Sequence, residues 1–177
     1  MCGRYVSPND AVIEREFNLV HTEWQFPPSF NVAPTQPVPI VRTVDGERRG
    51  ALLRWGLIPF FARGVPPKYS TINARAETVR TAASYRGPWQ RGQRCLVVAS
   101  GFYEWQVQAD GKTKVPFFIK CNDQEVFAFA GLWDSSRNEA GQRIESCVHL
   151  TVPANGLVGE IHNAKQRMPA ILEKSDP

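Results

Sequence analysis

The sequence predicts an α+β protein built mainly on an antiparallel sheet. Two Asp-Gly dipeptides, at positions 45–46 and 110–111, each separate two runs rich in β-branched and aromatic residues, which indicates a β-hairpin at each. Segments with helical character are few, so hairpins between a few helices are the expected arrangement. The chain has 177 residues, 42% hydrophobic and 21% charged, which suits one domain with a sizeable core. We therefore expect a single domain over residues 1–177.

The expected elements begin with a helix that runs from Ser7 to about Val20. Ser7 suits the N-cap, Pro8 suits the first turn, and Asp10 completes a capping box. Residues 26–39 follow, and their repeated proline excludes a regular helix and favours an ordered, extended loop. Three apolar residues are expected to anchor this loop: Phe30, Val32 and Ile40.

Strands are expected through most of the remaining chain. Three pairs of runs predict neighbouring strands: 38–44 with 51–55, 105–108 with 115–120, and 126–132 with 144–152 across the polar loop 135–142. The short apolar run 95–99 suits a central strand. Residues 73–80 are helical in composition, and residues 155–161 predict a short helical turn. Cys95, Cys121 and Cys147 are expected to be small buried residues on strands.

Charge and hydropathy narrow the class of protein. Lys and Arg total 21 against 17 Asp and Glu, giving a net charge of +4. This mild basic excess permits a nucleic-acid or phosphate partner without requiring one. The sequence contains no apolar stretch long enough to span a membrane and no secretory signal pattern at its start. We expect a cytoplasmic protein with no membrane partner, associated with the nucleoid when it acts on DNA if it is bacterial.

Cysteine and histidine spacing indicates neither a metal site nor a disulfide framework. The residues that lack the short spacings of a ligand set are Cys2, Cys95, Cys121, Cys147, His21, His149 and His162. The sequence also lacks a Gly-rich phosphate loop, a GxGxxG motif, a GxSxG elbow and an HExxH motif. We therefore expect no metal and no small-molecule cofactor.

Cys2 carries a distinctive chemical possibility because of its position. It is small and followed by Gly3, so removal of Met1 would leave an N-terminal cysteine. Such a residue has an α-amine with a pKa of about 7.7–8.0 and a thiol with a pKa of about 8.5. The amine can form a Schiff base with an aldehyde, and the thiol can then close a thiazolidine ring. From position alone, a chance cysteine at a frayed terminus is the simpler interpretation.

Seven segments, taken in order, change that interpretation. They are residues 1–5 (MCGRY), 30–35 (FNVAPT), 54–59 (RWGLIP), 71–78 (TINARAET), 101–105 (GFYEW), 129–133 (FAGLW), and Ile161-His162 with Arg167-Met168-Pro169. Together they resemble the SRAP family of abasic-site processing proteins, which occurs in bacteria and in animals. The resemblance covers essentially the whole chain.

The resemblance implies a fold, a partner and a reaction. The family fold has antiparallel strands in an open, barrel-like sheet with flanking helices. The partner is single-stranded DNA that contains an abasic site, bound in a positively charged groove by what we expect to be a monomer. The reaction is a covalent cross-link from Cys2 to the ring-opened aldehyde of the lesion, which shields it during the DNA-damage (SOS) response.

The resemblance also assigns catalytic roles to three further residues. Asn73 would lie by Cys2 and hydrogen-bond its amine or the opened deoxyribose, although its residue type also suits a helix N-cap. Glu104, between two aromatic residues, would protonate the sugar ring oxygen and then accept a proton. His162 would move protons during imine and thiazolidine formation. The alternatives are a surface Glu on a strand and a structural His.

Four residues are expected to contact DNA. Arg4 and Arg75 would bind phosphates on either side of the lesion, and Trp105 and Phe61 would stack on bases. Phe61 follows Phe60 where the family commonly has Trp. The family also usually continues past residues 168–169 into a further segment, and we expect this difference to affect stability more than chemistry. Four aromatic residues are left to the core: Tyr5, Trp55, Phe102 and Trp133.

Two other classes of function remain open at this point. The first is a thiol peptidase or autopeptidase with Cys2 as nucleophile, His162 as base and Glu104 as the residue that orients the base. The second is a non-covalent reader of modified DNA bases.

Overall fold

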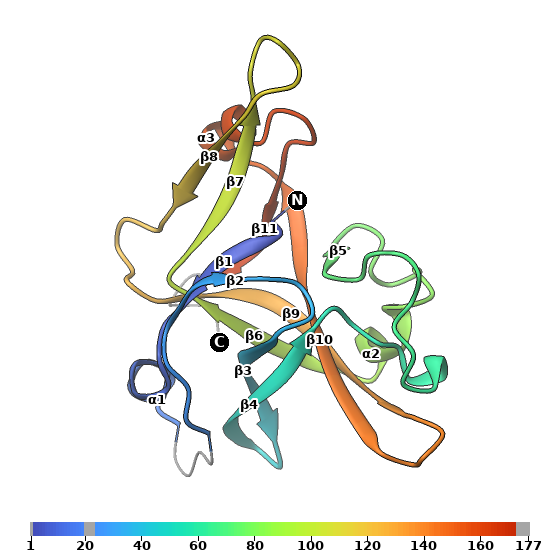
Figure 1. Cartoon of the computed structure of the whole chain (residues 1–177). Coiled ribbons are helices and arrows are strands. Elements are labelled where there is room, and N and C mark those ends of the chain that lie inside the picture. The colour runs from blue at the N-terminus through green and yellow to red at the C-terminus, as the bar shows by residue number, and fades with distance from the viewer. Residues whose placement is uncertain (1, 20–23, 173–177) are drawn as a thin grey trace.

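A five-stranded barrel is the centre of the computed structural model, which describes residues 2–19 and 24–172 (Figure 1). Its strands are β3 (Pro37–Val44), β4 (Glu47–Trp55), β6 (Arg94–Ala99), β9 (Phe127–Arg137) and β10 (Arg143–Pro153). They follow the order β10–β4–β3–β6–β9, and β9 pairs with β10 again, so the ring closes. The expected barrel-like sheet is therefore present, and in this chain it is a closed barrel.

Most pairings in the barrel are antiparallel, as expected. The exceptions involve β10, which runs parallel to β4 and to the short strand β5 (Asn73–Arg75). Two short strands, β11 (Arg167–Pro169) and β12 (Ile171–Leu172), pair with β10 and β9. β6 lies between β3 and β9, which confirms the central strand predicted at 95–99. β9 continues to Arg137, so it takes up part of the predicted polar loop.

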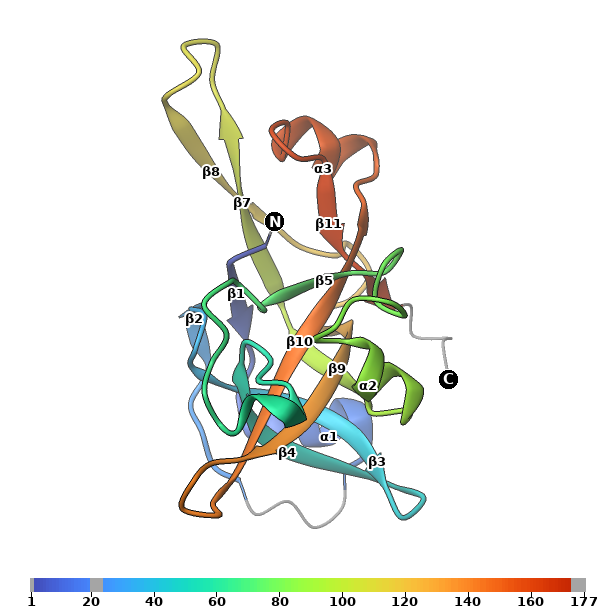
Figure 2. The same cartoon turned by 90° about the vertical axis from the view of Figure 1, so that its right-hand side faces the viewer.

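A second sheet carries the N-terminal strand. Its order is β2 (Ser29–Val32), β1 (Arg4–Ser7), β7 (Gly101–Val107) and β8 (Lys114–Ile119), all antiparallel. The β7–β8 hairpin projects beyond the barrel, and α3 (Gly156–Ile161) lies beside it (Figures 1 and 2). Both Asp-Gly hairpins and the helical turn at 155–161 are thereby confirmed.

The first helix differs from its prediction at both ends. α1 covers Asp10–Phe17, and Asn9 caps it by accepting a hydrogen bond from Val12 N at 3.0 Å. Ser7 is not the cap, because it still belongs to β1. The helix ends where Asn18 takes a left-handed backbone conformation with φ 53°. The predicted end at Val20, as well as Met1 and His21, lies outside the described residues.

Residues 73–80 do not form the predicted helix. Asn73–Arg75 is strand β5, paired in parallel with β10, and turns follow it. The backbone of this segment is satisfied by the edge of β10, and that tertiary contact overrides local composition. Asn73 therefore does not cap a helix. The other described helices are α2 (Arg86–Gln90) and the 3₁₀ turn η1 (Phe60–Ala62).

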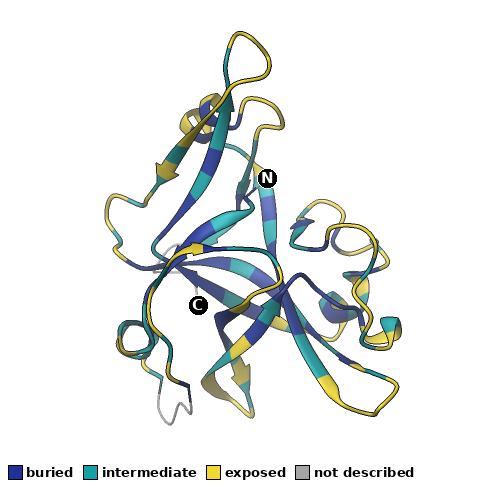
Figure 3. Ribbon diagram, in the orientation of Figure 1, coloured by how far each residue is buried: buried dark blue, intermediate teal, exposed yellow. Residues whose placement is uncertain are grey.

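Aromatic side chains fill the junction between the two sheets. Tyr5 meets Trp55 and Phe129 edge-on, with ring centroids 5.3 and 5.9 Å apart, and Phe102 packs against Phe129. Burial is concentrated on the barrel strands, β1 and the base of β7 (Figure 3). Tyr5, Trp55 and Phe102 are thus core residues, as predicted.

Of the remaining burial predictions, some are confirmed and others are wrong. Trp133 is only partly buried, and the guanidinium of Arg42 lies 4.2 Å from its ring centroid. Val32 and Ile40 are buried anchors, whereas Phe30 is 72% exposed, because β2 is an edge strand. Cys95 and Cys147 are buried; Cys121 is partly exposed and follows β8. None of the described helices is long and apolar enough to cross a membrane.

Candidate active site

Cys2 lies just before β1 and is fully buried. The pairing of Arg4 with Tyr103 fixes the start of β1 against β7, and this places Cys2 at the junction of the two sheets. Its Sγ donates to the Arg4 carbonyl at 3.5 Å. Burial raises the pKa of the thiol, and the negative charge of Glu104 raises it further.

Asn73 holds the backbone of Cys2. Its Nδ2 donates to the Cys2 carbonyl at 3.0 Å, and Tyr85 donates its hydroxyl to the Asn73 carbonyl at 3.3 Å. Asn73 pairs in register with His149 at the centre of β10, which fixes its position from the barrel side. Its Oδ1 is buried and has no hydrogen-bond partner among residues 2–19 and 24–172. The accepting capacity of this oxygen is therefore unused by those residues.

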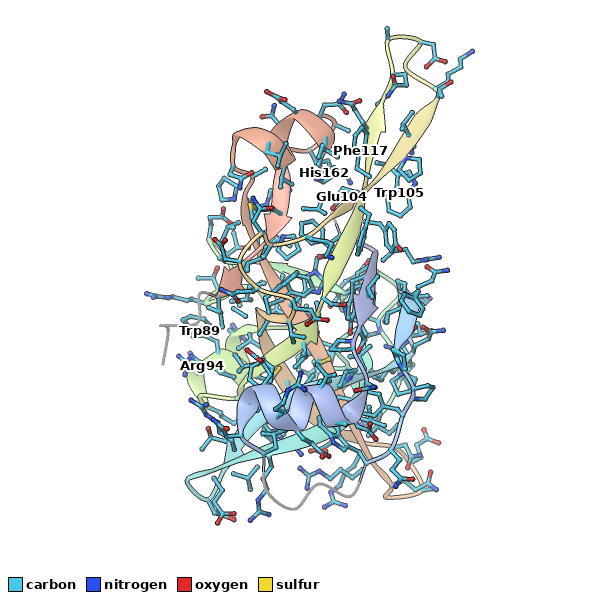
Figure 4. The ribbon with its side chains drawn as sticks, turned by 90° about the vertical axis from the view of Figure 1, so that its left-hand side faces the viewer. Trp89, Arg94, Glu104, Trp105, Phe117 and His162 are labelled. Atoms are coloured by element: carbon cyan, nitrogen blue, oxygen red, sulfur yellow. The ribbon has the colours of Figure 1, made fainter. Side chains whose placement is uncertain are left out.

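Glu104 and His162 form a buried pair. Only 2% of Glu104 and 5% of His162 is exposed, and Oε2 lies 3.8 Å from Nε2. Figure 4 shows the two side chains together between the β7–β8 hairpin and α3. Burial raises the pKa of Glu104, while the neighbouring His162 acts in the opposite direction. Phe117, the partner of Glu104 in β8, supplies part of the apolar wall beside it.

The ring of His162 is oriented by the segment that follows α3. His162 is the C-cap of α3, and its backbone N–H donates to Val158 O at 2.7 Å. Its Nδ1 lies 2.8 Å from the Arg167 carbonyl. The backbone N of Arg167 lies 3.3 Å from the same ring nitrogen, so both backbone polar groups of Arg167 contact Nδ1 and fix the orientation of the ring.

Asn163 joins the two elements that carry this pair, and the sequence analysis did not find it. Its Oδ1 accepts from Val107 N at 3.1 Å, and its Nδ2 donates to Val107 O at 2.8 Å. Gln106 adds a donation from Nε2 to Glu160 O at 3.1 Å. Asn163 therefore pairs with β7 as a neighbouring strand would. The only signal in the sequence is its position directly after His162.

Arg167 also received no role from the sequence beyond its place in a motif. Its guanidinium binds both oxygens of Glu77, at 2.6 and 3.0 Å, and donates to Thr151 O at 2.6 Å. The pairing with Arg167 lowers the pKa of Glu77 to about 2. Because the Arg167 carbonyl contacts His162, this ion pair indirectly anchors the histidine.

A cleft of about 380 Å³ opens beside the Glu104–His162 pair. Its wall is formed by both members of the pair and by Trp105, Val107, Lys114, Ala164 and Lys165. Two lysines at a cleft that contains a carboxyl group and an imidazole make it suitable for an anionic ligand that undergoes proton transfer.

The predicted DNA-contacting residues are distributed unevenly around this site. Trp105 lines the cleft, and Arg4 lies on the strand next to it, with its Nη1 donating to Gly3 O at 2.9 Å. Arg75 is exposed at the end of β5, two residues after Asn73. Phe61 is 52% exposed in η1, which is anchored on β9 by Asp134 and is not part of the cleft.

Comparisons with known proteins give matches that extend over the whole chain or nearly all of it. The family model described as SOS response associated peptidase (SRAP) matches residues 1–177. Abasic site processing protein YoqW of Bacillus subtilis is 40% identical over 176 residues, covering 97% of this chain and 76% of that protein. Abasic site processing protein HMCES of Gallus gallus is 32% identical over 215 residues, covering 98% of this chain and 62% of that protein.

Solved structures agree with the fold. A crystal structure of a protein from Bacteroides thetaiotaomicron superimposes with a TM-score of 0.84 at 27% identity, covering 98% of this chain and 78% of the other. One from Bordetella bronchiseptica gives a TM-score of 0.81 at 30% identity, with 97% and 84% covered.

Proposed function

Because the chain belongs to the SOS response associated peptidase (SRAP) family, we propose that it senses abasic sites in DNA and links to them covalently through Cys2. The relatives named as abasic site processing proteins support the lesion as substrate. The observation that carries the chemistry is the meeting of Cys2, Asn73, Glu104 and His162. They come from four separate segments: Asn73 hydrogen-bonds the Cys2 backbone, Glu104 lies 3.8 Å from His162, and the pairing of β1 with β7 brings Cys2 near the strand that carries Glu104.

The reaction begins at the closed sugar of the lesion. Glu104, in its neutral form, protonates the ring oxygen as the bond from that oxygen to the anomeric carbon breaks. The anomeric hydroxyl gives up its proton to the carboxylate, and the deoxyribose is then an open aldehyde. After removal of Met1, the α-amine of Cys2 adds to the aldehyde carbon, and loss of water gives a Schiff base. The thiol then adds to the same carbon and its proton moves to the nitrogen, which closes the thiazolidine. One water leaves overall, and no oxidant or reductant is needed.

The environment of each group supports its role. The raised pKa of Glu104 favours the carboxylic acid that the opening step requires. The nearby Nε2 of His162 can then exchange protons with the carboxyl group. Asn73 positions the Cys2 backbone, and its Oδ1, which has no hydrogen-bond partner among the described residues, would accept a hydrogen bond from the amine or from the opened sugar.

Positive and aromatic side chains account for the proposed preference for single-stranded DNA. Arg4 lies on β1, two residues after Cys2, and Arg75 lies on β5, two residues after Asn73, and both would bind backbone phosphates. Trp105 would stack on a base next to the lesion, and Phe61 on one farther away. We assign this activity to a single domain over residues 1–177 acting as a monomer in the DNA-damage response.

Cross-linking to a defined lesion tests the proposal. Processed protein lacking Met1 is incubated with a single-stranded oligonucleotide that contains one uracil, with and without uracil glycosylase. We expect a heat-stable adduct only with glycosylase. Cys2→Ser should give an adduct that borohydride traps and that heat otherwise destroys, because the amine remains and the thiol is lost. Protein that retains Met1 should give neither product.

The same experiment distinguishes the two other classes. Peptide cleavage without any adduct would establish a peptidase. Salt-sensitive binding without an adduct would establish a non-covalent reader.

A further inference from the structure

The outer face of the β1–β7–β8 sheet carries a row of partly exposed rings. Residues paired across a sheet share a face, so Arg4, Tyr103 and Phe118 lie on one side, as do Trp105 and Pro116. Glu104 and Phe117 lie on the opposite side, toward His162, as Figure 4 shows. We call Arg4, Tyr103, Trp105, Pro116 and Phe118 the outer-face ledge.

Phe118 lies flat against the sheet because Gly101 leaves room for it. A Cβ at Gly101 would come within 3 Å of two ring atoms of Phe118, so any larger residue there would displace the ring. Even so, 47% of Phe118 stays exposed, although the ring belongs to a large apolar side chain on a strand. The sheet therefore presents this ring to solvent.

Tyr103 extends the same surface toward β2. Its ring centroid is 4.9 Å from that of Phe118, with 35° between the planes. Its hydroxyl donates to the Phe30 carbonyl at 3.2 Å, which spans β1 and fixes the direction of the ring. Two adjoining rings with restricted orientation form a surface on which flat groups can stack at low entropic cost.

The ledge is continuous with the candidate active site and has a matching charge. Trp105 belongs both to the ledge and to the cleft that contains Glu104 and His162. Arg4 borders Tyr103 on one side, and Lys114 lies near the other end of β8, next to Val107. The lesion-bearing strand of the proposed function is a polyanion with a flat apolar group on each nucleotide.

We propose that the ledge binds unpaired bases on one flank of the abasic site, with Tyr103 and Phe118 as stacking surfaces beyond Trp105. This proposal rests on the proposed function and deepens it. It predicts that the protein gains affinity from nucleotides on that flank and not equally from both. The rings read no sequence, because every base offers a face for stacking.

Oligonucleotides extended on a single flank test the ledge. Two fluorescein-labelled oligothymidylates each carry one abasic site. In one of them about six nucleotides lie only on the 5′ side of the site, and in the other they lie only on the 3′ side. Anisotropy gives the affinity of the Met1-retaining protein, which binds without forming the proposed link. Phe118→Leu keeps an apolar cover over Gly101 but removes the π-face, and Phe118→Tyr keeps both. We expect Phe118→Leu to lose at least about fivefold in affinity on one flank and Phe118→Tyr to lose little.

The results that would overturn the ledge differ from those that would overturn the proposed function. Leu157→Ala changes an apolar residue on α3 that is even more exposed than Phe118 and lies outside the ledge, and it should bind like the parent protein. Equal affinity of Phe118→Leu and the parent on both flanks would overturn the ledge. Failure of the processed parent protein to cross-link would instead overturn the proposed function, whatever the flank dependence.

Discussion

Strand pairing positions Cys2 and Asn73, whereas side-chain hydrogen bonds join the strand that carries Glu104 to the segment that carries His162. On the first side, β1 pairs with β7 and β5 pairs with β10, so backbone ladders set the positions. On the second side, the hairpin and the α3 segment meet through Asn163, Gln106 and the Arg167 carbonyl.

Because of this difference, substitutions on the two sides are expected to change different properties: the stability of the fold on the first side and the rate of cross-linking on the second. The nucleophile side is continuous with the barrel core, so damage there is expected to appear in folding. The acid–base side projects from the barrel and rests on a few hydrogen bonds, so changes there are expected to appear in the kinetics of cross-linking and its pH dependence. Substitutions on each side test the distinction.

The largest effect is expected at His149, on the barrel side. Its ring lies 5.4 Å from Trp55 and 5.2 Å from Phe129, and neither ring nitrogen has a hydrogen-bond partner within the described parts of the chain. Burial lowers its pKa from 6.5 to about 3. Between these values the unfolded chain binds a proton that the folded chain does not, so stability falls as pH drops below about 6.5.

Denaturant unfolding of His149→Leu at neutral pH and near pH 4 measures this effect. Wild type should lose about 3 kcal/mol more than the variant over that range, from about 1.4 kcal/mol per pKa unit. Leu has a similar volume and leaves no polar atom in the core, so stability at neutral pH should not fall much. Glu104→Gln keeps His149 and should keep the acid-dependent loss. Parallel pH curves for wild type and His149→Leu would contradict the prediction.

On the acid–base side, Glu104→Gln should slow adduct formation by about 10²-fold or more, the usual scale of general acid catalysis. The substitution removes a proton donor and keeps the shape of the site. The measurement is the single-turnover rate with saturating abasic oligonucleotide. Glu139→Gln, in an exposed hairpin loop, is the matched control. A normal rate in Glu104→Gln would show that the free aldehyde reacts without help from this residue.

Asn163→Ala should have an intermediate effect, a decrease of about tenfold in the same rate. The change removes two hydrogen bonds to Val107, each worth about 0.5–1.5 kcal/mol. Water would then reach Glu104 more easily, and its raised pKa would move back toward the ordinary range. Because the acid form is active, the rate should begin to fall at a lower pH than in wild type. Asp110→Asn, at the exposed hairpin tip, should leave the pH profile unchanged; an unshifted profile in Asn163→Ala would mean that Asn163 does not position the pair.

The smallest effect is expected for Arg75→Ala. One lost phosphate contact should reduce the slope of log affinity against log salt by about 0.7 for single strands. The measurement is a salt titration with undamaged single-stranded DNA. Arg49→Ala, an exposed arginine paired with Glu47 on the β3–β4 hairpin, is the control. An unchanged slope in Arg75→Ala would leave Arg75 without a role in DNA binding.

Local chemistry explains which parts of the fold were predictable. At the first hairpin turn, Asp45 and Gly46 take φ values of 53° and 82°, which Asp and Gly tolerate, so the turn could be located from two residues. The cap of α1 was misplaced by two residues, because Ser7 and Asn9 are both good caps and only the end of β1 decides between them. Strand β5 was missed because its partner β10 is distant in the sequence.

The candidate site, like the fold, was predictable only where local chemistry decides. The identity of the reactive groups follows from the sequence, since a cysteine after Met1 has the chemistry of an N-terminal aminothiol wherever the chain places it. The motifs also indicated Asn73, Glu104 and His162. The two hydrogen bonds from the Asn163 side chain to the Val107 backbone were not predictable, because they form only when the fold brings Val107 opposite Asn163.

The sequence by itself determined the two Asp-Gly hairpins, one in the barrel and one in the second sheet, and the functional groups available to react. Only the tertiary structure decided that Glu104 is buried 3.8 Å from His162, that Asn73 holds Cys2, and that Phe118 lies exposed over Gly101. Turn conformations depend on neighbours in the chain, which the sequence lists directly. Burial, pKa and the distances between reactive groups depend on contacts between remote segments, which arise only when the two sheets pack together.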